Sequence, residues 1–280
     1  MCAISLSAAV APSTDNGVLL RRKFKNGAVE KYKMQMQMAM KMPGAPSSKP
    51  MNMTMSGDMS FTYDKVSGTS AEVTARTSKL SVKMVPDMGM AAANKMPPET
   101  STKMAIDSRG RISAMTLDKA TAAGPAGATI SSLTSGGFGS LLPEKRVRPG
   151  DTWVVPMPAQ LAMFGAHNAG LKQKFLGEKT VSGVRVYDIL EEAHIDINGL
   201  KMPGMAQGNA QAQSALSKTR GHLDISGHLY LKKSDCSFQL MNMSTKTKMT
   251  FPNPAGSSAT KSSAPFTMDQ TMEMTLTRTN

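Results

Sequence analysis

Methionine is the residue type that dominates this sequence, with 26 copies against eight phenylalanines, four tyrosines and one tryptophan. The thioether sulfur is a soft ligand that suits Cu(I). The unbranched methionine side chain also adapts to apolar ligands of varied shape. The composition therefore points to two chemistries, soft-metal binding and the holding of an apolar molecule, and the spacing of the methionines tells where each could occur.

Methionines recur at every second position in three segments, at 32–42, 51–63 and 266–276. Side chains at positions i and i+2 of a strand lie on one face, about 6.6–7 Å apart. Each segment therefore becomes a ladder of apolar side chains, and we expect the ladders to line an apolar ligand-binding face. The candidate binding residues are Met34, Met36, Met38, Met40, Met53, Met55, Met59, Phe61, Met272 and Met274.

The loop at 84–96 is the candidate for the alternative chemistry, a site for Cu(I). It contains a proline and a glycine, which let a chain wrap around an ion, and its candidate ligands are Met84, Met88, Met90 and Met96. The His, Cys or aromatic co-ligands expected beside such sulfurs are absent nearby. The alternation of apolar and polar residues also places the methionines of the ladders in a core, which argues against a metal site. A copper chaperone or sink is therefore the alternative hypothesis, after apolar binding.

Enzyme signatures are absent: there is no nucleophile elbow, phosphate-binding loop, paired-cysteine motif or zinc-protease motif. The best group of potentially reactive side chains occupies alternate positions of one expected strand, so its members would share one face. These residues are His222, Asp224, Ser226 and His228. Its two histidines would lie about 20 Å apart, too far for one tetrahedral metal. His194, with Glu192 and Asp196, has the same pattern. We expect two solvated faces here, no catalytic residue and no cofactor.

Two cysteines are present, Cys2 and Cys236. Cys2 lies in a small, apolar opening stretch that resembles the later part of a signal peptide, although no basic residues precede it. We expect residues 1–15 to be the remnant of a signal peptide or a disordered leader. Removal of this segment would leave Cys236 without a disulfide partner. The expected location is outside the cytoplasm: periplasmic, secreted or associated with the cell envelope.

Strict alternation of apolar and polar residues predicts an all-β protein. Between 51 and 63 the odd positions are apolar or glycine and the even positions are polar, and the two other ladders repeat this pattern. Such a period of two gives a strand one apolar and one wet face, whereas a helix would distribute the same residues around its circumference. We therefore expect half-buried antiparallel strands.

The order of the segments also repeats, which predicts an internal duplication. Lys-Met-Pro-Gly occurs at 41–44 and 201–204, and Met53–Met59 has a counterpart in Leu223–Leu229. We expect two related β units, half-barrel or sandwich-like, at 16–118 and 150–280. An Ala-, Gly- and Ser-rich linker at 119–149, helical in part or coil, would join them. Whether the two units enclose one cavity or stand apart is open at this point.

The segment Leu142–Trp153 reads Leu-Pro-x-Lys-x-Val-x-x-Gly-Asp-Thr-Trp and lies between the two expected units. With the later Gly-x-Leu-Tyr-Leu at 227–231, it resembles a β-rich family of bacterial extracytoplasmic proteins of unknown function. More loosely, the long amphipathic strands without disulfides resemble the half-barrels of lipoprotein carriers. The resemblance implies the compartment and the architecture, and it transfers no functional residues.

The chain is basic, with 33 Lys and Arg against 20 Asp and Glu and a net charge of +13. This balance favours anionic partners such as a membrane surface. The basic residues are scattered in short clusters such as Arg21, Arg22, Lys23 and Lys25. Nucleic-acid binding would need a basic stripe interleaved with aromatic residues. We therefore expect ordinary solvated faces and no nucleic-acid partner.

Together these patterns predict a non-catalytic extracytoplasmic protein that holds an apolar, lipid-like ligand on methionine-rich inner sheet faces. The first alternative is a methionine-based Cu(I) chaperone or sink. The second is a structural or envelope-interaction protein without a small ligand. The sequence leaves open the ligand's identity and the oligomeric state.

Overall fold

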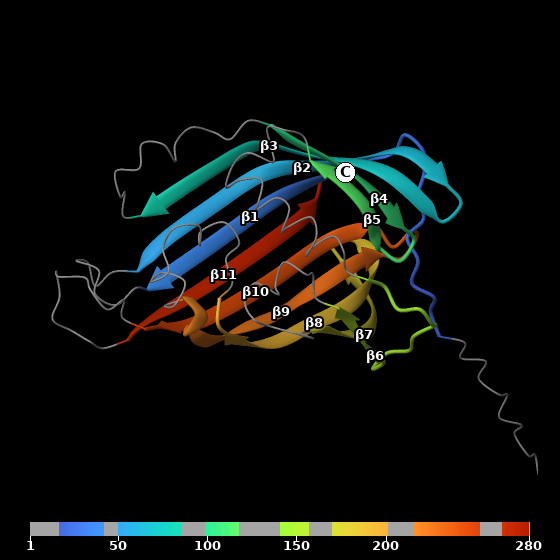
Figure 1. Ribbon diagram of the computed structural model, residues 1–280. Helices are drawn as coiled ribbons and strands as arrows, with labels where there is room; N and C mark the ends of the chain where they lie inside the picture. Colours follow the sequence, from blue (N-terminus) through green and yellow to red (C-terminus); the bar gives the residue numbers. More distant parts are fainter. Residues whose placement is uncertain are drawn as a thin grey trace, which may run out of the picture.

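A computed structural model describes residues 17–41, 50–85, 99–117, 141–156, 170–200, 216–252 and 265–279. The described chain is built almost wholly from strands (Figure 1), as the alternation predicted. The strands are β1 (Val29–Lys41), β2 (Met51–Ser67), β3 (Ser70–Val85), β4 (Thr100–Asp107), β5 (Ile112–Leu117), β6 (Thr152–Pro156), β7 (Gly170–Val181), β8 (Val184–Asn198), β9 (Arg220–Lys232), β10 (Phe238–Phe251) and β11 (Phe266–Arg278). Within the described ranges, no helix has the length and apolar character needed to cross a bilayer.

All eleven strands belong to one open antiparallel sheet, in the order β5-β4-β3-β2-β1-β11-β10-β9-β8-β7-β6. The pairing of β1 with β11 joins the strands of the two expected units into one continuous surface. In space each half of the sheet runs in reverse chain order, from β5 to β1 and then from β11 to β6. The internal duplication itself stays a prediction.

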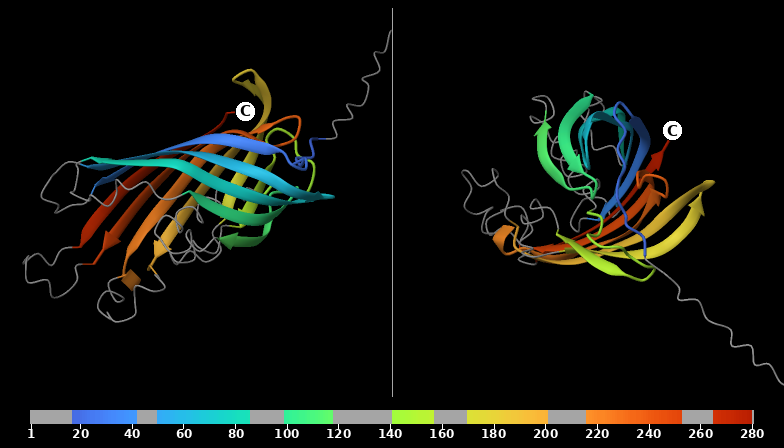
Figure 2. Two further views of the ribbon diagram at one scale, coloured as in Figure 1. Left: turned by 90° about the horizontal axis from the view of Figure 1, so that it is seen from above. Right: turned by 90° about the vertical axis from the view of Figure 1, so that its right-hand side faces the viewer.

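The sheet curls into an open trough whose concave face carries the core (Figure 2). On β1 the concave residues Tyr32, Met34 and Met36 are only 1–4% exposed, whereas Lys33 and Gln35 between them are exposed. Cross-strand register aligns such residues into rows. One row crosses seven strands: Gly57, Met34, Leu276, Met241, Leu229, Ile189 and Phe175.

A bulge in β3 keeps its apolar residues on the concave side. Lys79 has a positive φ of 52°, and the register with β2 shifts by one residue at this point. A shift of one residue exchanges the two faces of a strand. Consequently the buried positions change from odd, as in Val73, to even, as in Leu80. Gly57 on β2 leaves room for the displaced strand, since an added Cβ there would lie 3.1 Å from Leu80 Cδ1.

Two irregular segments, 17–28 and 141–151, pack together and close one end of the trough; we call them the plug. Val18 and Val147 exchange backbone hydrogen bonds of 2.8 and 2.9 Å. The backbone N–H of Arg22 donates to the Ser108 carbonyl at 2.7 Å, which ties the plug to the turn between β4 and β5. Leu142 and Val147 of the Leu-Pro-x-Lys-x-Val motif are buried in the core, so that motif packs the plug.

Replacing Leu229 by Ala tests the concave core. Leu229 is fully buried in the seven-strand row, and such a truncation costs about 2–5 kcal/mol of unfolding free energy. The control is Ser226→Ala, because Ser226 is exposed on the opposite face of β9, where surface changes stay within about 0.5 kcal/mol. Urea unfolding followed by circular dichroism measures both. Equal losses in the two variants would contradict a core on the concave side.

Candidate apolar ligand-binding face

The structure places all ten candidate binding residues on the concave face of three neighbouring strands. Strand β1 carries four of them, β2 carries four and β11 carries two. β1 lies between β2 and β11, so the ladders stand side by side and form one continuous surface. On β1 they are Met34, Met36, Met38 and Met40; on β2 they are Met53, Met55, Met59 and Phe61; on β11 they are Met272 and Met274.

The register assembles the methionines into two rows across the trough. The inner row contains Met55, Met36, Met274 and Met243 on β2, β1, β11 and β10. The outer row contains Met84, Met53, Met38 and Met272 on β3, β2, β1 and β11. Directly opposed residues in antiparallel strands have Cβ atoms about 4.5–5.5 Å apart. Eight thioethers therefore gather in one patch, and Met243 and Met84 join it although the ladders alone did not indicate this.

Burial falls along this face from the plug toward the other end of the strands. Met36 and Met59 are each 4% exposed, whereas Met38, Met40 and Met53 are half-buried. A second apolar cluster, around Ile197 and Met249, continues the concave face on β8–β11. At the far end the rings of Phe251 and Phe266 stack with centroids 4.9 Å apart. Beyond the tightly packed core the concave face is therefore mainly apolar, with Gln270, Thr245 and Thr247 among its methionines.

The candidate copper loop lies mostly outside the described residues. Of its four methionines, only Met84 is described, on the concave face of β3 opposite Met53. Met88, Met90 and Met96 lie outside the described ranges. The sulfur cluster that the structure does show is the outer row, which contains Met84.

A buried polar cluster lies in the trough next to the plug, and the sequence analysis missed it. Tyr32 donates a hydrogen bond of 2.7 Å to Glu30, and Arg278 lies 3.5 Å from the same carboxylate. Burial raises the pKa of Tyr32 and of Tyr63, so both hydroxyls keep their protons. Glu30 and Arg278 share the parity of Met34 and Met274 on their strands. Charged residues in phase with an apolar ladder were the signal that could have revealed this cluster.

Arg22 corrects the expectation that the basic cluster at 21–25 is an ordinary solvated face. Its side chain is 9% exposed and enters the trough, with the guanidinium carbon 4.3 Å above the centre of the Phe238 ring. Leu20 and Phe24, two residues to either side, point into the same core. The plug turns this short alternating segment inward, whereas Lys23 and Lys25 remain exposed.

The three described histidines, His194, His222 and His228, lie on the convex face, and pairing of β8 with β9 brings His194 and His222 together. Asp224 Oδ1 lies 2.5 Å from His194 Nδ1, and Asp224 Oδ2 lies 3.7 Å from His222 Nε2. The His194 side chain is 62% exposed. Among the residues that the structure describes, no group of three or more His, Cys, Asp and Glu side chains is arranged to hold a metal ion. The arrangement is an ion-pair network on a wet surface.

Cys236 is a free, buried thiol in the turn between β9 and β10. Burial raises the pKa of the Cys236 thiol above its ordinary value. The thiolate is the nucleophilic form of cysteine, so this environment suppresses its reactivity. Cys2 lies outside the described residues.

No protein-family model and no curated protein matches the chain, so membership of the extracytoplasmic family stays a prediction. Among solved structures, one titled for lipid–protein interactions in lipovitellin aligns with a TM-score of 0.51 and 11% sequence identity. The alignment covers 92% of this chain and 26% of that chain, so the protein spans about a quarter of the lipovitellin chain. This likeness shows a shared fold, that of a large open β-sheet.

Two further solved structures align over most of both chains with low TM-scores. DynF from the dynemicin biosynthesis pathway of Micromonospora chersina has a TM-score of 0.23 and 7% identity, over 96% of this chain and 92% of its own. A DUF1329 family protein from Desulfovibrio piger has a TM-score of 0.21 and 9% identity, over 88% of this chain and 85% of its own. At these TM-scores neither alignment establishes a common fold.

The His194–Asp224 pair predicts a shifted titration. The hydrogen bond to Asp224 raises the pKa of His194 above its ordinary value of 6.5. The pair therefore favours the folded protein when His194 is protonated, and this contribution disappears as the pH rises through the raised pKa. In an NMR titration, the His194 ring should titrate above 6.5 and Asp224→Asn should lower its midpoint. An unchanged midpoint in that variant would contradict the pairing.

The burial of Cys236 predicts that its thiol reacts slowly with alkylating reagents. We expect a thiol reagent such as iodoacetamide to label Cys236 much more slowly in the folded protein than in urea, because both burial and a raised pKa limit the thiolate. Mass spectrometry of the peptide that contains Cys236 measures the rate. Equal labelling rates in the folded and unfolded protein would indicate an accessible thiol and revive a nucleophilic role.

Proposed function

We propose that this protein is a non-catalytic binding protein that holds an apolar, lipid-like ligand on its methionine-rich concave face. The observation that carries the proposal is the continuity of that face. The two methionine rows extend across five strands and reach half-buried positions at Met38, Met40 and Met53. A core that served stability alone would not need an apolar surface that continues beyond its tightly packed part.

The methionine content suits a ligand of variable shape. Methionine has three rotatable bonds and a polarizable sulfur, so it can fill irregular gaps around different chains. Each buried CH₂ group contributes about 0.8 kcal/mol. About ten methylenes would therefore offset an association cost of several kcal/mol. An acyl chain is the simplest ligand that supplies so many methylenes in one dimension.

The fold and the sequence support the proposal independently. The structure whose title concerns lipid–protein interactions in lipovitellin shares the open β-sheet, at 11% identity. The small, apolar stretch at 1–12 is typical of the end of a signal peptide. We therefore place the protein outside the cytoplasm, where a carrier for an apolar molecule would cross an aqueous space.

One observation favours a second candidate, a soft-metal site. Met53 lies directly opposite both Met84 and Met38, so three thioethers occupy adjacent positions of the outer row. Thioether sulfur is a ligand for Cu(I). This site would overlap the apolar face, so one set of variants distinguishes the two functions.

Met38→Lys is the variant that tests apolar binding, and Gln37→Lys is its matched control. Met38 is half-buried on the concave face of β1, whereas Gln37 is exposed on the convex face of the same strand. A charge on the concave face must be desolvated when an apolar ligand covers it. In native mass spectrometry of gently purified protein, we expect a heterogeneous co-purified mass that organic extraction removes. Met38→Lys should lose this mass and Gln37→Lys should keep it.

A copper site would need the thioether sulfurs at these positions, whereas apolar binding needs only their volume and hydrophobicity. Replacing Met38 and Met53 by Leu nearly preserves volume and hydrophobicity, so an apolar ligand should still bind while Cu(I) uptake under reducing conditions should disappear. Stoichiometric Cu(I) uptake by the unmodified protein, lost in this variant, would replace the proposal with the copper function. A clean protein mass without lipid or copper would leave a structural or envelope-interaction role.

A further inference from the structure

Arg22 is a buried cation that lacks a carboxylate partner among the described residues. Its neighbour Arg278 is paired, with Glu30 at 3.5 Å and Ser237 Oγ at 2.7 Å. The guanidinium of Arg22 instead lies over the Phe238 ring, with its carbon 4.3 Å from the ring centre. Two arginines thus accompany the buried carboxylate of Glu30, and the half-buried Asp235 also interacts with Arg278.

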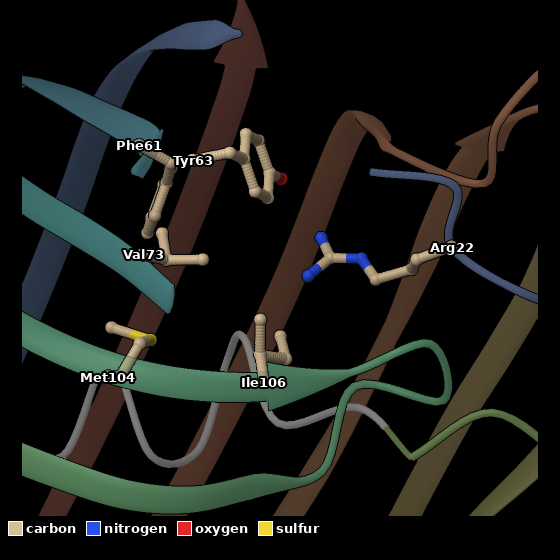
Figure 3. Close-up of a pocket in the computed structure, with 6 residues that line it drawn as sticks. All are labelled: Arg22, Phe61, Tyr63, Val73, Met104 and Ile106. Carbon is tan, nitrogen blue, oxygen red and sulfur yellow. The ribbon is translucent and has the colours of Figure 1, made fainter. Parts of the chain in front are cut away.

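This guanidinium points into a small cavity at the closed end of the trough (Figure 3). The other lining residues come from the concave faces of β2, β3 and β4, and the cavity volume is about 10 Å³. That is about the room of one water molecule. The lining residues besides Arg22 are Phe61, Tyr63, Val73, Met104 and Ile106. A cation therefore faces a cavity whose walls are otherwise almost entirely apolar.

An unpaired charge in such a place is costly unless a counter-ion joins it. An anion at the cavity would be held by a charge-assisted hydrogen bond, the stronger class of hydrogen bond. The Tyr63 side chain lines the same cavity, and its hydroxyl is hydrogen-bonded to Glu30. Because the cavity has room for about one water molecule, any anionic head group must displace side chains that line it, and a carboxylate displaces less than a bulkier tetrahedral phosphate.

The cavity-lining residue Phe61 lies on the same face of β2 as the concave methionines of that strand. After Phe61, the next concave methionines of β2 are Met59, Met55 and Met53. The path from Met59 to Met51 spans eight residues, about 27 Å at 3.4 Å per residue. The acyl chains of one leaflet occupy about half of the roughly 30 Å hydrocarbon core of a bilayer. The path is therefore long enough for a full-length acyl chain, which would have to displace the buried side chains of Met59 and Met55, 4% and 8% exposed.

We propose that Arg22 anchors the carboxylate of a fatty acid, whose acyl chain lies along the concave methionines of β2 toward the far end of the trough. This inference rests on the proposed function and specifies its ligand class, a single-chain anionic amphiphile. The flexible methionine side chains give way to the chain, and the carboxylate takes the place of water at the guanidinium.

The test compares palmitate with hexadecanol, which has the same chain length and no charge. Delipidated full-length protein is titrated with each ligand by calorimetry. Arg22→Met removes the charge and keeps an apolar side chain, and Lys23→Met is the matched control because Lys23 is the exposed neighbour. We expect Arg22→Met to bind palmitate about 10- to 100-fold more weakly, the strength of a charge-assisted hydrogen bond. Its affinity for hexadecanol and both affinities of Lys23→Met should not change.

A spectroscopic readout reports the anchor itself. Palmitate labelled with carbon-13 at the carboxyl carbon is titrated with acid in the complex and followed by NMR. The guanidinium should hold the carboxyl pKa below the value found in the Arg22→Met complex. Arg22→Lys, which keeps the charge, should retain part of that difference. If Arg22→Met does not fold, two measurements still test whether Arg22 binds the carboxylate. They are the carboxyl pKa in the Arg22→Lys complex and the comparison of palmitate with hexadecanol in the unmodified protein.

The outcomes separate this inference from the proposed function. If the unmodified protein binds neither ligand, the proposed function fails. If it binds palmitate and hexadecanol equally well, or if Arg22→Met binds palmitate unchanged, the apolar carrier stands and the Arg22 anchor is wrong. Tighter binding of hexadecyl phosphate than of palmitate would also overturn the carboxylate assignment.

Discussion

The pairing of β1 with β11 is the interaction on which the rest of the structure depends. It joins residues 32–41 to residues 269–278 in an unbroken antiparallel register. Without it, the described strands would form two separate sheets, β1–β5 and β6–β11. It also places Met36 opposite Met274 and Met38 opposite Met272, so both methionine rows cross the middle of the sheet at this pair. The pairing closes almost the whole chain into one loop, and such distant contacts form slowly during folding.

The same register separates polar from apolar residues along the trough. Near the plug, charged and hydroxyl groups such as Glu30 and Tyr32 satisfy one another inside the concave face. Farther along, at Met38 and Met53, the face carries thioethers and no charge. The trough therefore has one polar end, while the rest of its concave face is mainly apolar. The plug matters to this arrangement because it contributes the unpaired cation and seals the polar end from one side.

Much of the fold could be predicted from the sequence, because alternation depends only on neighbours along one strand. The ladders of β1, β2 and β11, and the wet face of His222 and His228, required no knowledge of tertiary structure. What alternation cannot give is register. The meeting of Met84 with Met53, and of His194 with Asp224, depends on which strands pair and where each bulge falls. Arg22 was missed for a related reason, since its burial results from a plug that is held by backbone hydrogen bonds rather than by a sequence pattern.

The trough remains open, so the described sheet ends in two edge strands, β5 and β6. An exposed edge offers its backbone groups to any other extended chain, which is a route to aggregation. Both edges here are short, and β6 ends in Pro156, a residue that cannot donate a ladder hydrogen bond. These features oppose the addition of a twelfth strand from another molecule. A protein of this shape can thus keep a wide apolar surface available to a ligand while its own edges resist polymerisation.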